Sequence, residues 1–250
     1  PIWQWEGEEG AAAALSTFKA ASDLCEEFDY IFCHNEVTLY KYIEEYAPDL
    51  FEDIKKHIKN GRWKIIGGWY LQPDCNMPCG ESFVRQIQFG KNYFKDRFGV
   101  EVNTAYNVDA FGHSVGLVQI MKKCGQNNCV IVRMGDDPVE DRHLIWQGLD
   151  GSKIKLAALR GYNSPLGGAV GKITRVMGEA EHETECIMWG VGNHGGGPSR
   201  KDLRDIEQLI EESDVEICHS TPDAFFDEIQ PTYVHKKSFT ISIEQLALRF

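Results

Sequence analysis

Residues 104–114 read TAYNVDAFGHS, and this stretch decides the predicted fold. Residues 104–108 predict a short buried strand, and the rest of the stretch forms the loop that follows it. The spacing of apolar residues then predicts a helix over 115–123 and a second strand over 129–134. A strand, a helix and a further strand in this order are typical of a parallel sheet with helices outside it.

The same alternation extends along the chain in both directions. Further helices are predicted over 8–27, 38–60 (divided at Pro48), 81–97, 199–212 and 222–229. Further strands are predicted over 30–33, 63–70, a hairpin at 144–159 that turns at Asp150-Gly151, 186–191 and 215–218. About seven strands favour an α/β fold of the seven-stranded (β/α) barrel type, with its first strand missing or incomplete. In such barrels the chemistry lies on the loops after the strands.

Composition and charge exclude several classes of function. The chain has 250 residues, of which 42% are hydrophobic, which is ample for a packed core. Its formal net charge of −12 repels phosphate backbones and anionic lipids, so we expect neither nucleic acid nor membrane partners. The chain shows no signal-like segment, and its 8 cysteines are expected to be free buried thiols in a cytoplasmic protein.

Two loops after predicted strands contain carboxylates. Asp109 follows strand 104–108, where it is either a functional carboxylate at the rim of a barrel or a cap for the next helix. Asp74 lies in the loop over 71–80, and Glu81 opens the next helix, where its charge favours the helix dipole. His34 follows strand 30–33, at the rim or in a surface pair with Glu36.

A glycine-rich loop over 190–198 follows another predicted strand. Its glycines match the spacing of a dinucleotide-binding fingerprint, but the next strand ends at Cys218 rather than in an acidic residue. The alternative is a loop whose backbone approaches a ligand closely, with Asn193 and His194 as polar contacts. Tryptophans near strand ends suit stacking on sugar rings, although ordinary packing is the expected role of any single one.

Taken together, these residues resemble glycoside hydrolase family 38, the zinc-dependent retaining α-mannosidases. The resemblance spans Pro1 to about Pro231. Its matching stretches are PIWQW at 1–5, GRWKIIGGW at 61–69, GES at 80–82 with RQ at 85–86, NVDAFGHS at 107–114, Trp146 with DGS at 150–152, and GNHGGGP at 192–198.

The resemblance implies a seven-stranded β/α barrel and roles for particular residues. Asp109 matches the nucleophile, which also binds the zinc ion, one per active site. Trp3 and Phe111 match residues that line the sugar site, and Arg133 lies where the family has an arginine near the nucleophile. His194 is expected to bind substrate, an α-mannoside.

The chain also departs from the family pattern. The family's first zinc ligands, a His-x-Asp pair, come just before the residue matching Pro1, and its last ligand, a histidine, is expected beyond Phe250. We therefore expect residues 1–250 to be an N-terminal catalytic domain that is incomplete at both ends. Many relatives carry an aspartate where Asn193 stands, so the general acid/base is not assigned. The sequence leaves open whether the protein forms a homo-oligomer.

Two alternative functions have their own sequence requirements. A zinc-dependent carbohydrate deacetylase on a related barrel would need two histidines four residues apart, and no two histidines of this chain have that spacing. A catalytically inactive sugar-binding remnant remains the other alternative, against which the position of Asp109 on the predicted rim argues.

Overall fold

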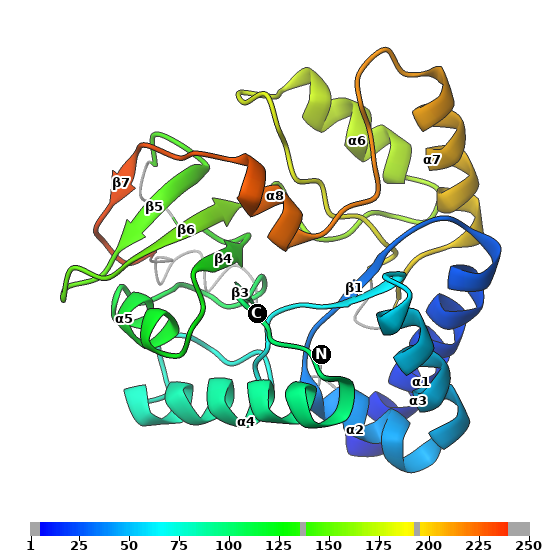
Figure 1. Ribbon diagram of the computed structural model, residues 1–250. Helices are drawn as coiled ribbons and strands as arrows, with labels where there is room; N and C mark the ends of the chain where they lie inside the picture. Colours follow the sequence, from blue (N-terminus) through cyan, green and yellow to red (C-terminus); the bar gives the residue numbers. More distant parts are fainter. Residues whose placement is uncertain (1–5, 136–138, 193–195, 240–250) are drawn as a thin grey trace. The chain divides into compact units, whose positions relative to one another are not determined.

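A computed structural model describes residues 6–135, 139–192 and 196–239 (Figure 1). Its helices are α1 (Gly7–Glu27), α2 (Val37–Tyr46), α3 (Pro48–Lys59), α4 (Gly80–Phe98), α5 (Gly116–Lys123), α6 (Ala169–Gly178), α7 (Arg200–Glu212) and α8 (Pro222–Glu228). Its strands are β1 (Phe32–His34), β2 (Trp63–Ile65), β3 (Thr104–Tyr106), β4 (Asn128–Ile131), β5 (His143–Gln147), β6 (Lys153–Ala158) and β7 (Val234–His235). The chain is therefore an α/β protein, as predicted.

The chain divides into two compact units. The first comprises residues 1–34, 38–64 and 161–221, and the second comprises residues 35–37, 65–160 and 222–250. Each unit is thus built from segments that are distant in the sequence.

Aromatic packing holds the first unit together. Phe18 of α1 packs against Tyr40 of α2 and Trp63 of β2, with ring centroids 5.1 and 5.3 Å apart. The Trp63 indole donates a hydrogen bond of 2.8 Å to the Tyr40 hydroxyl, which satisfies both polar groups in a buried position. Ile173 of α6 and Ile206 of α7 belong to a second cluster in this unit.

The second unit contains a five-stranded sheet in the order β3-β4-β6-β5-β7. The pairs β3–β4, β4–β6 and β5–β7 are parallel, whereas β5 and β6 form the antiparallel hairpin that the sequence predicts. Gly151 has a φ of 83° in the turn of this hairpin, a conformation that glycine adopts without steric cost. Figure 1 shows β4 and β6 side by side in this sheet.

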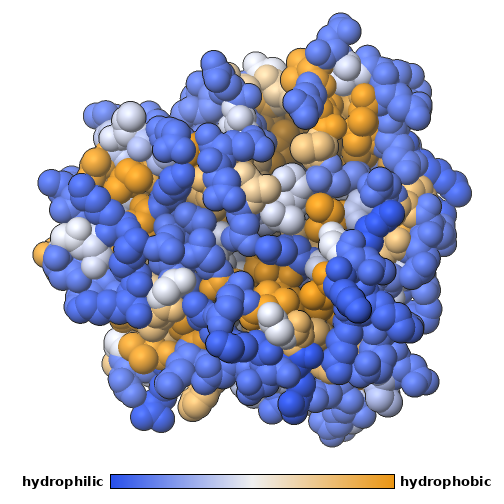
Figure 2. Space-filling model, in the orientation of Figure 1, coloured by the Kyte–Doolittle hydropathy of each residue, from blue (hydrophilic) through white to orange (hydrophobic). Residues whose placement is uncertain are grey.

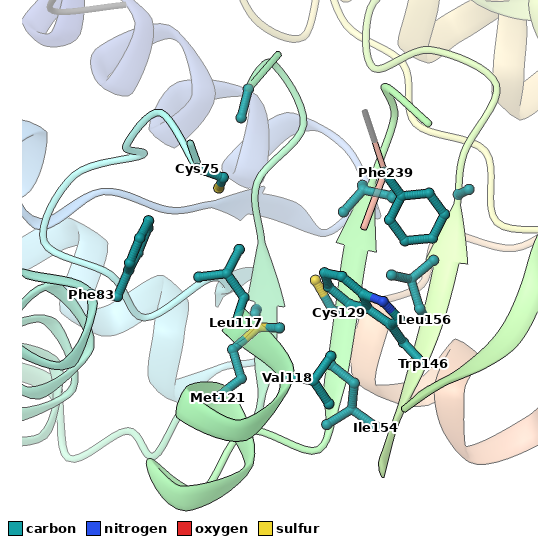
Figure 3. Close-up of a cluster of buried hydrophobic side chains, with 14 of the residues drawn as sticks. Cys75, Phe83, Leu117, Val118, Met121, Cys129, Trp146, Ile154, Leu156 and Phe239 are labelled. Atoms are coloured by element: carbon teal, nitrogen blue, oxygen red, sulfur yellow. The ribbon is translucent and has the colours of Figure 1, made fainter. Parts of the chain in front are cut away.

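The core of the second unit lies between this sheet and α4 and α5. Leu117, Val118 and Met121 of α5 gather with the side chains of Cys129 and Trp146 from the strands (Figure 3). Each of these residues is at most 3% exposed. Burial on this scale stabilises the unit by roughly 1.5–3 kcal/mol for each large apolar side chain.

The seven-stranded barrel is not confirmed by the strands of the described residues, which form separate sheets of two and five strands. The predicted strand over 63–70 ends at Ile65, and Gly67 and Gly68 beyond it adopt left-handed φ values of 74° and 69°, far from the extended backbone of a regular strand. The predicted strands over 186–191 and 215–218 run without ladder pairing, apart from one isolated bridge at Val191.

The predicted helices are confirmed with small shifts at their ends. Pro48 occupies the first position of α3 and so separates it from α2, as its missing N–H requires. Hydrophilic side chains cover most of the face drawn in Figure 2. Of the helices in the described segments, none is both long enough and apolar enough to cross a bilayer.

Candidate active site

Asp109 lies just after β3, and Arg133 lies just after the neighbouring strand β4. Because the two strands are parallel, their carboxyl ends bring these two residues to the same edge of the sheet. Arg133 Nε donates a hydrogen bond of 3.0 Å to Asp109 Oδ1, and its Nη2 donates to the same oxygen. The side chains are only 24% and 17% exposed. The carboxylate is therefore oriented by a partly desolvated guanidinium group.

Phe111 also contacts this arginine. The Arg133 guanidinium carbon is 4.8 Å from the centre of the Phe111 ring, within the range of a cation–π contact. The described residues thus bring together three of the predicted site residues, Asp109, Phe111 and Arg133. The remaining two, Trp3 and His194, lie outside the described residues.

Asn107 anchors the loop that carries Asp109. Its side-chain amide donates to the Pro73 carbonyl oxygen and to Cys75 Sγ, both at 3.0 Å. Cys75 points into the core of the unit (Figure 3), and burial raises the pKa of its thiol. The loop over 72–75 therefore supports the Asp109 loop through these hydrogen bonds. The sequence did not indicate this role for Asn107 or for Cys75.

His113 fixes the far end of the Asp109 loop. Its ring Nε2 lies 3.1 Å from the Asn107 carbonyl oxygen, and its backbone exchanges hydrogen bonds of 2.7 and 2.9 Å with Phe239. Burial lowers the pKa of His113 to about 4, since little solvent remains to stabilise the imidazolium form. His113 is therefore a neutral packed histidine that hydrogen-bonds to the backbone.

Gly112 permits close packing within this loop. It has a φ of 109°, and a Cβ atom there would lie 2.7 Å from Asn76 Nδ2 and 2.9 Å from the Phe239 carbonyl oxygen. Asn76 in turn donates a hydrogen bond of 2.8 Å to the Phe111 carbonyl oxygen. The loop conformation thus requires glycine at this position.

The other carboxylates singled out in the sequence have local roles. Asp74 Oδ1 accepts hydrogen bonds from the backbone N–H groups of Asn76 and Met77, which closes an Asx turn. Glu81 forms an exposed pair with Arg85 one turn along α4. Neither arrangement requires a catalytic function.

The described part of the glycine-rich loop belongs to the first unit. Its ends are joined by a hydrogen bond of 2.7 Å from Val191 N to the Gly197 carbonyl oxygen. Beneath it, Lys172 of α6 donates to the carbonyl oxygens of Gly161, Asn163 and Met188 at 3.0, 3.2 and 2.5 Å. Burial lowers the pKa of Lys172 to about 8. This lysine ties the segment over 161–163 to Met188, just before the loop, and nothing in the sequence pattern singled it out.

The profile of the Glycosyl hydrolases family 38 N-terminal domain matches residues 1–244. The chain belongs to this family. The family 38 chain is 28% identical over 242 residues to "Alpha-mannosidase G" of Dictyostelium discoideum, covering 92% of this chain and 22% of that relative. It is 27% identical over 217 residues to "Alpha-mannosidase 2C1" of Homo sapiens, covering 83% of this chain and 21% of that relative. The chain thus spans about a fifth of the length of these relatives.

Solved structures share the fold of this family 38 chain. An alpha-mannosidase from Enterococcus faecalis V583 superposes with a TM-score of 0.78 at 20% identity, covering 93% of this chain and 28% of that chain. A 4-alpha-glucanotransferase from Thermococcus litoralis gives a TM-score of 0.70 at 16% identity, covering 94% of this chain and 38% of that one. At these identities the likeness concerns the fold alone.

Asp109 offers a ligand of the type that zinc accepts, a carboxylate oxygen. Within the described residues, it does not belong to any group of three or more His, Cys, Asp or Glu side chains whose ligand atoms converge. Since a protein zinc site uses at least about three protein ligands, a zinc ion at Asp109 requires ligands from outside these residues. Asp109 therefore fits the metal as one ligand of a larger set.

Proposed function

We propose that this chain is the N-terminal catalytic domain of a retaining α-mannosidase, with Asp109 as the nucleophile. The observation that carries the proposal is the Asp109 carboxylate, held by Arg133 beside Phe111 at the carboxyl ends of β3 and β4 in a family 38 chain. A carboxylate in this position can attack an anomeric carbon, and an aromatic ring beside it can pack against a sugar.

The proposed reaction is a double displacement. An Asp109 oxygen forms a bond to the anomeric carbon while the bond to the leaving oxygen breaks, and that oxygen takes a proton from a general acid. Water then attacks the same carbon, gives up a proton to the same group as base, and releases Asp109 as a carboxylate. Arg133 keeps the attacking carboxylate in one orientation throughout, which is the contribution that its two hydrogen bonds support.

Zinc is the proposed cofactor, with Asp109 as one ligand and the others in the segments predicted before Pro1 and beyond Phe250. When bound, the ion would hold and polarise hydroxyl groups of the sugar. Trp3 and His194 are the proposed further substrate contacts. The seven-stranded barrel, the cytoplasmic location and a possible homo-oligomer also remain predictions.

Asp109→Asn in the protein that contains this chain tests the nucleophile. The variant keeps the size of the side chain but lacks the charge needed to form a glycosyl ester, so kcat on an aryl α-mannoside should fall by at least about 10³-fold. A mechanism-based fluoro-sugar should label the wild-type peptide containing Asp109 and leave the variant unlabelled. Labelling of Asp74 or Glu81 instead, or normal turnover by the variant, contradicts the assignment.

A further inference from the structure

Glu36 has an unusual backbone conformation. Its φ is 67°, and among the described residues it is the only residue other than glycine with positive φ. A side chain in this left-handed region costs roughly 1–2 kcal/mol, so the surrounding structure must favour it. Such outliers concentrate at functional sites, where strain holds a group in a required place.

The contact that Glu36 makes is a hydrogen bond in the second unit. Its carboxylate Oε1 accepts from the backbone N–H of Gln72 at 3.1 Å. Glu36 is half-buried, and this partial loss of solvent raises the pKa of its carboxyl group. A carbonyl-type oxygen accepts this hydrogen bond in either protonation state, so the contact does not depend on the charge of the group.

Gln72 connects Glu36 to the loop that carries Asp109. Its side-chain Oε1 accepts a hydrogen bond of 2.7 Å from the backbone N–H of Val108, the residue directly before Asp109. The preceding N–H groups of Tyr70 and Leu71 donate to the Gln86 carbonyl oxygen and to its side-chain Oε1, at 2.9 and 2.8 Å. Glu36 therefore supplies the acceptor for the third successive N–H in a segment whose end touches the Asp109 loop.

We infer that Glu36 is a positioning residue, which sets the place of Asp109 through the chain of contacts Glu36–Gln72–Val108. The inference rests on the proposed function only for its kinetic consequence, because the chain of hydrogen bonds exists whatever the protein hydrolyses. Glu36 itself is not a catalytic residue in this assignment, since it acts through Gln72.

Three substitutions of Glu36 distinguish the effect of its side-chain acceptor oxygen from the effect of its strained backbone. Glu36→Gln keeps a carbonyl oxygen at the same reach, whereas Glu36→Ala and Glu36→Gly remove it, and glycine also relieves the left-handed φ. On an aryl α-mannoside, Ala and Gly should lower kcat by at least about tenfold with KM changed less than about threefold, and Gln should stay within about threefold of wild type. The Gly variant should melt at a higher temperature than the Ala variant while being equally slow. Glu101→Ala, which removes an exposed carboxylate bonded to Lys95, is the matched control and should leave kcat unchanged.

Amide hydrogen exchange provides a readout that does not require activity. The amides of Gln72 and Val108 should exchange faster in Glu36→Ala and Glu36→Gly than in wild type, and at the wild-type rate in Glu36→Gln. If wild type cleaves no α-mannoside, the proposed function fails while this measurement still tests the chain of contacts. Unchanged exchange at Val108 in the Ala and Gly variants overturns the inference, as does a Gln variant as slow as the Ala variant.

A double-mutant cycle with Gln72→Ala tests whether Glu36 acts through Gln72. If Glu36 acts through Gln72, removing both side chains should lower kcat no further than the worse single substitution. Additive losses would mean that the two residues act independently, and the inference would be wrong.

Discussion

Arg133→Met tests how much the arrangement around Asp109 contributes to catalysis. The substitution removes both hydrogen bonds to Asp109 Oδ1 and the contact with the Phe111 ring, while methionine keeps an apolar stem of similar length. The two hydrogen bonds share one acceptor oxygen, so we count them as one charged interaction of about 1.5–3 kcal/mol, and a cation–π contact at a partly exposed site contributes about 0.5–1 kcal/mol. Their sum, about 2–4 kcal/mol, predicts a fall in kcat/KM of about 30- to 1000-fold.

Arg133→Lys gives an intermediate case. Lysine keeps the positive charge but lacks the planar guanidinium group, which donates to Asp109 Oδ1 from two nitrogens and lies near the Phe111 ring. We expect a loss of about tenfold, measured as kcat/KM on an aryl α-mannoside with circular dichroism to verify folding.

The control for both variants is Arg85→Met, which breaks an arginine–carboxylate pair of the same chemistry, 2.9 Å long, on the exposed face of α4. An exposed pair of this kind contributes at most about 1 kcal/mol to stability and should contribute nothing to turnover. Folded Arg133→Met with kcat/KM within about threefold of wild type would refute the role given to this arginine.

Three further predictions concern stability, acid and metal. Gly90→Ala in α4 should destabilise the protein by about 2 kcal/mol in denaturant unfolding, because the new Cβ would lie 2.2 Å from the Gly68 carbonyl oxygen. Gly171→Ala in α6, where a new Cβ would meet no atom within 4 Å, should instead stabilise the protein by up to about 1 kcal/mol. His113 has a pKa of about 4 in the folded protein against 6.5 ordinarily, so between these pH values the unfolded state binds a proton that the folded state does not. The free energy of unfolding should therefore fall by about 3 kcal/mol as the pH is lowered from 6.5 to 4. A His113→Gln variant whose unfolding free energy has the same slope against pH would contradict this. Chelation of the protein that contains this chain should abolish α-mannoside hydrolysis and zinc should restore it, whereas full activity after exhaustive metal removal would exclude the proposed cofactor.

Most helices of this protein, and the existence of most of its strands, follow from the sequence alone; α6 and β7 are not among the predicted elements. A helix depends on residues three and four apart and on local stop signals, so Pro48 divides α2 from α3 and Gly99 ends α4 with a φ of 69°. The hairpin of β5 and β6 follows from Asp150-Gly151 for the same reason. The position of Asp109 after a strand is likewise a local property. The resemblance also rests on short local motifs, and it placed Arg133 near Asp109 and Phe111 in the expected sugar site.

Only the tertiary structure decided how strands pair and what holds the nucleophile loop. Residues 186–191 have the apolar pattern of a strand, yet a strand also needs a partner at the right distance, which no periodicity encodes. Glu36, Gln72 and Val108 come from three segments that approach one another only in the folded chain. The sequence suggests for Glu36 only a possible surface pair with His34, because its left-handed φ and its contact with Gln72 are consequences of long-range packing that neighbouring residues do not reveal.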